Sequence, residues 1–275
     1  MKILGIEAAA KVAGAAVYEN GKILAGEFTD GALTHSETLM PMIDRVLQKA
    51  KVGIDEIELI TLTNGPGSFT GLRIGAATAK GLALAGARMD EEGNMTGGIG
   101  ILPLPTLEVL ASGAIPFAQE QKSLIGKDPL LVGTMDARRH QVYTAAYDTD
   151  LKQVIAPEAM PPTVLAEKLK ELGRPCIFLG DAAALYQDVF SEILGELFTL
   201  APEEIRGHRA GTTCRLADRK IREAIEDGKP MPFIHGWEMR IEYLRKPQAE
   251  REREERLRRG KAAGETRDIA GEPEK

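Results

Sequence analysis

The sequence has few cysteines and no long apolar run. Its two cysteines, Cys176 and Cys214, occur among 275 residues without metal-ligand spacing, so we expect buried thiols in a reducing compartment. No stretch approaches the roughly 18 uninterrupted apolar residues of a membrane span. The first residues, Met1 to Leu4, lead directly into a strand-like run, which is not the pattern of a signal peptide. These absences predict a cytoplasmic protein without membrane contact.

An excess of positive charge and a cluster of histidines are also missing. The net charge of −6 argues against a protein that holds nucleic acid over its general surface. Zinc hydrolases need two histidines at helical spacing plus a third ligand. We therefore expect no metal site, because the histidines are scattered along the chain at His35, His140, His208 and His235.

Glycine and alanine are abundant between Asn64 and Gly86. The turn Gly65-Pro66-Gly67 follows the apolar run Ile57–Leu62, which predicts a strand, a tight turn and then a helix capped by Ser68. Glycine in such a turn lets another backbone or a phosphate come close. A phosphate loop, however, needs Gly-Lys-Ser/Thr where this chain has Gly71-Leu72-Arg73. The pattern favours a tight turn without a ligand.

The predicted helix from Leu72 to Ala85 has two apolar stripes. A surface helix needs only one such stripe to pack on its own sheet, so two stripes suggest burial on both sides. Either a second molecule covers the other side, or the helix is the central helix of a one-chain core. One stripe is Leu72, Gly75, Ala76, Ala79 and Ala83, and the other is Ile74, Ala77, Gly81, Leu82 and Ala85.

Two segments of the chain repeat one pattern of three short apolar runs. Residues 2–28 and 130–155 each read as a three-stranded meander, and Asn20-Gly21 is a strong hairpin signal in the first. The first strand ends in an acid in both, Glu7 or Asp136. The repeat predicts two α/β lobes facing each other across a cleft. We place the N-terminal lobe at 1–104, the C-terminal lobe at 105–235 and a charged, partly disordered tail at 236–275.

A helix is expected from Thr34 to Lys51. Thr34 and Glu37 have the spacing of a capping box, and Pro41 should kink the helix. The group His35, Ser36 and Glu37 invites a catalytic interpretation, but helix capping and surface contact are favoured.

The C-terminal part of the chain differs in charge from the rest. Residues 240–261 hold nine basic and five acidic residues, while residues 1–239 carry a net charge of −8. The alternating Glu and Arg residues of 249–259 favour a solvated helix over an RNA contact. We expect disorder from Lys261 onward.

Three segments resemble one protein family. THSETLMPMIDRVL, NGPGSFTGLRIGAATAKGLA and MDARRHQVYTAAY, within residues 34–147, are similar to the TsaB family, also called YeaZ. The resemblance implies a duplicated actin-like, or ribonuclease-H-like ATPase, fold of two α/β lobes. It also implies a non-catalytic subunit that pairs with the transferase TsaD, together with TsaE, for threonylcarbamoyl transfer to the adenosine next to the anticodon in tRNA. Contact with tRNA would then be made through the complex.

The resemblance also implies where partners bind. Family members contact TsaD, or a second copy of themselves, through two helices of the N-terminal lobe. Carried onto this sequence, the contacting residues are His35, Ser36, Leu39, Met42, Ile43, Val46, Leu72, Gly75, Ala76, Ala79 and Ala83.

One departure from the family pattern concerns nucleotide binding. The usual Ile-Asp-Thr-Ser is replaced by Ile6-Glu7-Ala8-Ala9, which loses both hydroxyls. A cleft site made by Glu7, Gly65, Gly67 and Asp136 would therefore bind nucleotide weakly. We expect no required cofactor and no catalytic residue, with ATP or ADP bound weakly or shared at an interface. The alternatives are an ATP-binding phosphotransferase or ATPase and, last, a metallopeptidase.

Overall fold

The computed structural model describes residues 1–29, 34–85, 87–89 and 95–245. Met1–Leu244 form one compact unit. Among the described helices, none combines the length and apolar character that crossing a membrane requires. The predicted charged helix at 249–259 and the predicted disorder from Lys261 lie outside the described residues.

The first sheet contains the N-terminal meander and two parallel strands, in the order β3-β2-β1-β4-β7. Its strands are β1 (Lys2–Glu7), β2 (Ala13–Glu19), β3 (Lys22–Thr29), β4 (Leu59–Gly65) and β7 (Gly100–Pro105). Asn20 and Gly21 join β2 to β3 with φ angles of 46° and 88°. These are the positive values that a two-residue hairpin turn demands, so the predicted turn is confirmed.

The second sheet repeats this arrangement, in the order β10-β9-β8-β11-β12. Three antiparallel strands are again followed by two parallel ones. The strands are β8 (Leu130–Asp136), β9 (Val142–Tyr147), β10 (Gln153–Met160), β11 (Cys176–Leu179) and β12 (Phe198–Leu200). The predicted fold class, a duplicated actin-like α/β fold with two lobes, is confirmed by this matching topology.

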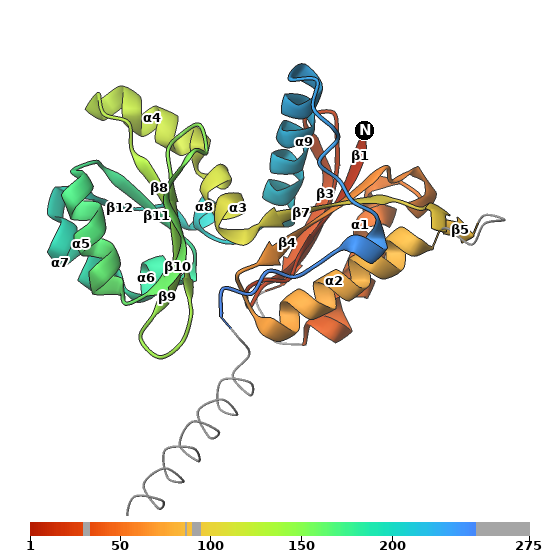
Figure 1. The fold of residues 1–275 in the computed structure, drawn as a ribbon, viewed down its shortest axis with the longest axis horizontal. Helices are drawn as coiled ribbons and strands as arrows, with labels where there is room; N and C mark the ends of the chain where they lie inside the picture. Colours follow the sequence, from red (N-terminus) through yellow and green to blue (C-terminus); the bar gives the residue numbers. More distant parts are fainter. Residues whose placement is uncertain (30–33, 86, 90–94, 246–275) are drawn as a thin grey trace, which may run out of the picture. The chain divides into compact units, whose positions relative to one another are not determined.

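Helices cover both faces of the first sheet (Figure 1). On one face, α1 (His35–Ala50) and α2 (Phe69–Leu84) pack on Leu4, Ile6 and their neighbours. On the other face, α9 (Ala210–Glu226) packs on β1 and β2. Thr34 caps α1 in the predicted capping box with Glu37, and Ser68 caps α2 by accepting a hydrogen bond from Gly71 N–H.

The chain exchanges two helices between the sheets, since α3 (Thr106–Gly113) and α9 each pack on the sheet that they do not follow directly in the sequence. The short helix α3 follows β7 but packs on β8 and β9 of the second sheet. In return, α9 follows the second sheet and packs on the first. The lobe boundaries at 104/105 and 235/236 stay a prediction. The other helices are α4 (Ile115–Ile125), α5 (Pro162–Leu172), α6 (Asp181–Leu185), α7 (Gln187–Leu194) and α8 (Glu203–Arg206).

The strand β7 lies at the edge of the first sheet, and its residues Leu102 and Leu104 are buried. Pro103 and Pro105 make this strand hard to predict from the sequence. They are tolerated because an edge strand needs fewer N–H donors. Before β7, β5 (Ala87–Met89) pairs with β6 (Met95–Gly97) in an antiparallel two-stranded sheet.

The segment from Ile234 to Leu244 also belongs to this compact unit. Ile234 exchanges two backbone hydrogen bonds with Ile101 of β7, and Glu242 N–H donates to the carbonyl of Asn64 at the end of β4. The chain therefore returns to the first lobe and runs beside α2, as Figure 1 shows.

Candidate functional site

The helix faces predicted to bind a partner are largely turned inward. Nine of the eleven predicted positions belong to the buried core around the first sheet or between the sheets. On α1 and α2, these positions are Leu39, Met42, Ile43, Val46, Leu72, Gly75, Ala76, Ala79 and Ala83. The chain's own residues already cover these nine positions, and their assignment as contact residues stays a prediction.

Gly75 shows why the inner stripe of α2 is made of small residues. A Cβ at Gly75 would lie 3.1 Å from the Cβ of Ala8, just after β1. The inner stripe of α2 therefore packs closely, and its partner is the chain's own first lobe. Dispersion contacts along the backbone offset the unfavourable helix propensity of glycine here.

The second stripe of α2 is the exposed one. Ala77, Gly81 and Ala85 are exposed, and Ile74 is partly buried. A Cβ at Gly81 would meet no atom of the described residues within 4 Å. On α1, the side chain of Met40 is 48% exposed. The surface left for another molecule is therefore the opposite stripe from the one predicted.

His35 and Ser36 lie at the start of α1, next to the Thr34 cap. His35 Nε2 lies 3.1 Å from the carbonyl oxygen of Ala10, and Ser36 is exposed. Ser36 Oγ lies 3.0 Å from Thr34 Oγ1. These contacts agree with helix capping and surface contact. Among the described residues, no group of three or more His, Cys, Asp or Glu side chains is placed to hold a metal ion.

The two glycines of the Gly65-Pro66-Gly67 turn pack against other backbone segments of the same chain. A Cβ at Gly67 would overlap the carbonyl of Ala9, and the Ser68 N–H donates to that same carbonyl at 2.6 Å. Gly65 has φ of 135°, and its Cβ would overlap the carbonyl oxygen of Glu242. The glycines thus permit close backbone approach, but to the β1–β2 turn and the C-terminal segment.

Glu7 lies at the end of β1 and is fully buried. Its Oε1 accepts hydrogen bonds from Ala9 N–H at 2.8 Å and from Thr63 Oγ1 at 3.0 Å. Its Oε2 lies 3.8 Å from Nδ1 of His208, which is also buried. Burial lowers the pKa of His208, although the neighbouring Glu7 carboxylate opposes that shift. No local sequence pattern marks His208 as a partner of Glu7, because the two residues lie far apart in the chain.

Asp136 ends β8 as Glu7 ends β1, but its surroundings differ. Its Oδ1 accepts from Arg138 N–H at 2.8 Å, and its Oδ2 lies 3.5 Å from the Arg138 guanidinium. The Asp136 N–H donates to Asp181 at 3.2 Å. Burial raises the pKa of Asp181, although the hydrogen bond from the Asp136 N–H opposes that shift. Asp136 is therefore held within its own lobe.

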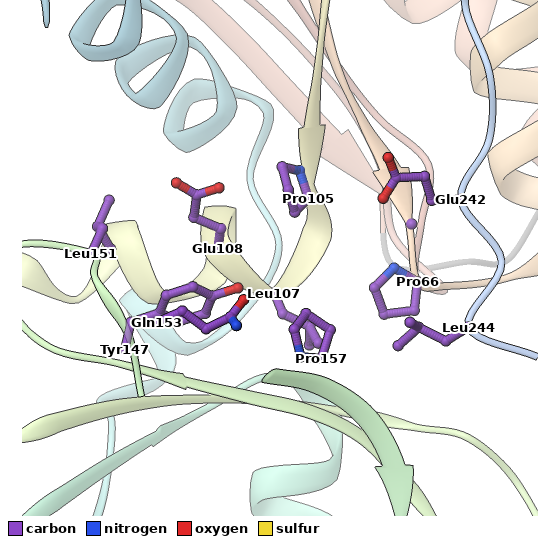
Figure 2. Close-up of a pocket in the computed structure, with 11 residues that line it drawn as sticks. Pro66, Pro105, Leu107, Glu108, Tyr147, Leu151, Gln153, Pro157, Glu242 and Leu244 are labelled. Atoms are coloured by element: carbon purple, nitrogen blue, oxygen red, sulfur yellow. The ribbon is translucent and has the colours of Figure 1, made fainter. Parts of the chain in front are cut away.

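A pocket of about 480 Å³ lies where α3 and the second sheet meet the Gly65-Pro66 turn. Figure 2 shows the carboxylates of Glu108 and Glu242 on opposite sides of this space. The Lys220 ammonium lies 2.6 Å from Glu108. Of the four predicted nucleotide-binding residues, only Gly65 lines this pocket; Glu7, Gly67 and Asp136 do not.

The residues present do not fit a nucleotide. The acid that would hold a metal ion through water, Glu7, is enclosed, and the turn amide that would meet a phosphate, Ser68 N–H, already has a partner. Of the two carboxylates beside the pocket, Glu108 is paired with Lys220, whereas Glu242 would repel phosphate groups.

Comparison with known proteins identifies relatives over most of the chain. The family model described as TsaD, tRNA N6-adenosine threonylcarbamoyltransferase, matches residues 30–253. The tRNA threonylcarbamoyladenosine biosynthesis protein TsaB of Bacillus subtilis is 31% identical over 71% of this chain and 77% of its own length. Its counterpart in Escherichia coli is 27% identical over 84% of this chain and 94% of its own length. The structure of YeaZ from Pseudomonas aeruginosa matches the fold with a TM-score of 0.66 at 20% identity, covering 88% and 99% of the two chains.

Proposed function

Because the chain belongs to the TsaB family and also matches the family model described as TsaD, we propose that it is a non-catalytic subunit for threonylcarbamoyl transfer to tRNA. In this proposal it binds TsaD, which carries out the transfer in the cytoplasm, and TsaE joins the two. The complex reaches the adenosine next to the anticodon, and this chain requires no nucleotide of its own. ATP or ADP, if bound, is held weakly or shared at the interface.

The non-catalytic role is supported by how the nucleotide-site residues are used. One carboxylate oxygen of Glu7 accepts hydrogen bonds from Ala9 N–H and the Thr63 hydroxyl, and the other oxygen faces His208. The Ser68 N–H bonds to Ala9. A group that is buried and already hydrogen-bonded must lose those contacts before it can bind a ligand. These residues therefore favour a structural role for the region.

The partner surface in this proposal is the outer face of α1 and α2. It comprises Ile74 and Gly81 of α2, Ala85 directly after α2, and Met40 of α1, all exposed or partly exposed. The single observation that carries the proposal is the open space beside Gly81. Helices pack at axis separations of about 8–10 Å, and small residues permit the closest approach. The same face would join two copies of this chain when TsaD is absent.

The thermodynamic role of the chain follows from such an interface. A subunit that binds only one arrangement of TsaD stabilises that arrangement by its differential affinity. The chain then contributes to transfer without touching the reacting atoms.

Co-purification with TsaD tests the interface. Gly81→Arg should abolish it while the chain stays folded, because the position is open and arginine has the better helix propensity. Ala156→Arg, at an exposed alanine of β10 in the second lobe, is the matched control and should bind TsaD normally. Retention of TsaD by folded Gly81→Arg would place the interface elsewhere.

A further inference from the structure

A second surface feature lies on another side of α2, where the C-terminal segment runs beside it. There, an open groove of about 410 Å³ separates α2 from residues 239–243. Its floor is mainly apolar, and three cationic side chains, Arg73, Lys80 and Arg240, line it. We call this feature the basic groove. Its lining residues are Arg73, Ala76, Ala77, Lys80, Met239, Arg240, Ile241 and Tyr243.

The cations of the basic groove are not neutralised within the part of the chain that the structure describes. No described carboxylate lies within 4.0 Å of the charged nitrogens of Arg73, Lys80 or Arg240. Arg240 instead donates to the carbonyls of Trp237 at 3.1 Å and Met239 at 3.3 Å. These cations stand out because residues 1–239 carry a net charge of −8. The groove is thus a local positive site on an acidic body.

Aromatic rings lie next to these cations. The Arg73 Nε donates to the hydroxyl of Tyr243 at 3.1 Å, and its guanidinium carbon lies 3.7 Å above the centroid of the Phe69 ring. The Phe69 and Tyr243 centroids are 5.0 Å apart. Tyr243 remains 39% exposed, so its ring is available to a ligand. Arg73 is held in a fixed position and does not need to be ordered on binding.

We propose that the basic groove binds a single-stranded segment of RNA, with phosphates on Lys80 and Arg240 and a base on the Tyr243 ring. Single strands are held by just this pairing of a cationic track with aromatic stacking surfaces. An acidic protein segment would use the cations but would gain little from an exposed ring. The inference rests on the proposed function, since it assigns a contact for the tRNA substrate to this subunit.

The basic groove and the proposed TsaD surface occupy neighbouring sides of α2, which adjoin at the exposed Ala77. At 3.6 residues per turn, Arg73 and Lys80 lie about a quarter-turn around the helix axis from Ile74 and Gly81. One helix therefore offers a protein partner and an RNA strand separate faces. An RNA bound in the groove would lie at the edge of the subunit interface.

Binding of the unmodified tRNA transcript tests this inference, measured by fluorescence anisotropy at several salt concentrations. The full chain is used alone and in complex with TsaD. Lys80→Ala/Arg240→Ala should weaken binding about tenfold at 0.1 M salt and reduce the slope of log K against log salt by about 1.5, the loss of two phosphate contacts. Lys22→Ala/Arg215→Ala removes the same charges from exposed sites elsewhere and should change neither quantity.

A second pair of variants isolates the stacking contact. Tyr243→Phe keeps the ring and should retain most of the affinity, whereas Tyr243→Leu should weaken binding about tenfold at every salt concentration without changing the slope. A single-stranded decamer should compete better than a duplex of equal length.

The outcomes separate this inference from the proposed function. Unchanged tRNA binding by Lys80→Ala/Arg240→Ala overturns the groove assignment, even if the variant still co-purifies with TsaD and supports transfer. Loss of TsaD binding with unchanged tRNA binding also overturns it, because the groove would then hold an acidic protein segment. Failure of the wild-type chain to bind TsaD counts against the proposed function, while tRNA binding by the chain alone still tests the groove.

Discussion

Glu7 Oε2 and His208 Nδ1 face each other 3.8 Å apart inside the first lobe, at the end of β1 where a nucleotide-binding acid was expected. Both side chains are buried, and neither of these two atoms has a hydrogen-bond partner in the described structure. Glu7 instead connects β1, β4 and the loop before α9 through Thr63 and His208. Glu7 is therefore a structural residue in the interior of the lobe.

The buried histidine predicts a specific pH dependence of stability. Its pKa is lowered in the folded chain by burial, with the Arg209 charge acting in the same direction and Glu7 against it. The unfolded chain then binds the proton more readily, so the free energy of unfolding falls as pH drops below the ordinary histidine value of 6.5. Between pH 7.5 and 5, thermal unfolding should show a smaller loss of stability for His208→Gln than for the wild type. His140→Gln, at an exposed histidine, should behave as the wild type, and equal pH dependence in all three proteins would contradict the assignment.

Gly65 is predicted to be intolerant of a side chain. Gly65→Ala combines a φ of 135° with overlap against the carbonyl of Glu242, so we expect a loss of at least about 1–3 kcal/mol. Gly228→Ala is the matched control, since its φ is also positive, at 62°, but its Cβ would meet no atom within 4 Å. Hydrogen exchange at the Glu242 amide should accelerate only in Gly65→Ala. Equal effects of the two substitutions would show that backbone strain alone matters.

The two stripes of α2 should respond oppositely to alanine. Gly81→Ala fills open space in a helix interior and should stabilise the chain by up to about 1 kcal/mol. Gly75→Ala gains the same helix propensity but places its Cβ 3.1 Å from Ala8, and overpacking of a core costs about 1–3 kcal/mol. Urea unfolding of both variants measures the difference. A more stable Gly75→Ala would mean that the inner stripe is loosely packed.

Nucleotide binding by the chain alone is predicted to be absent at micromolar concentrations. To hold a metal nucleotide, the Ser68 amide would have to give up its hydrogen bond to Ala9, and the fully buried Glu7 carboxylate would have to become accessible. Isothermal titration with ATP and magnesium should give no saturable heat. Micromolar binding with turnover would instead favour the alternative of an ATPase or phosphotransferase.

The sequence was sufficient for the elements whose signals are local. The Asn20-Gly21 turn, the Thr34 and Glu37 capping box and the Ser68 cap were each predicted from a few adjacent residues and confirmed. The repeated meander gave the duplicated fold, because both copies carry the same succession of strands and turns.

The orientation of α2 could not be predicted in the same way. Both of its stripes are small and apolar, so the pattern cannot tell which one meets the sheet, and only the position of Ala8 against Gly75 decides it. The pairing of Glu7 with His208 joins residues from opposite ends of the chain, and no local pattern marks it. Contacts of this kind depend on the tertiary fold.

The central claim is that TsaD binds the outer face of α1 and α2. The amount of threonylcarbamoyladenosine formed on tRNA tests this claim most directly. TsaD and TsaE are supplied with threonylcarbamoyl-adenylate and tRNA while this chain is titrated in. We predict that product formation rises with the wild-type chain and with Ala156→Arg, reaches a plateau, and stays at the level without the chain for Gly81→Arg. Equal product with and without the chain, or full activity with Gly81→Arg, would contradict the account.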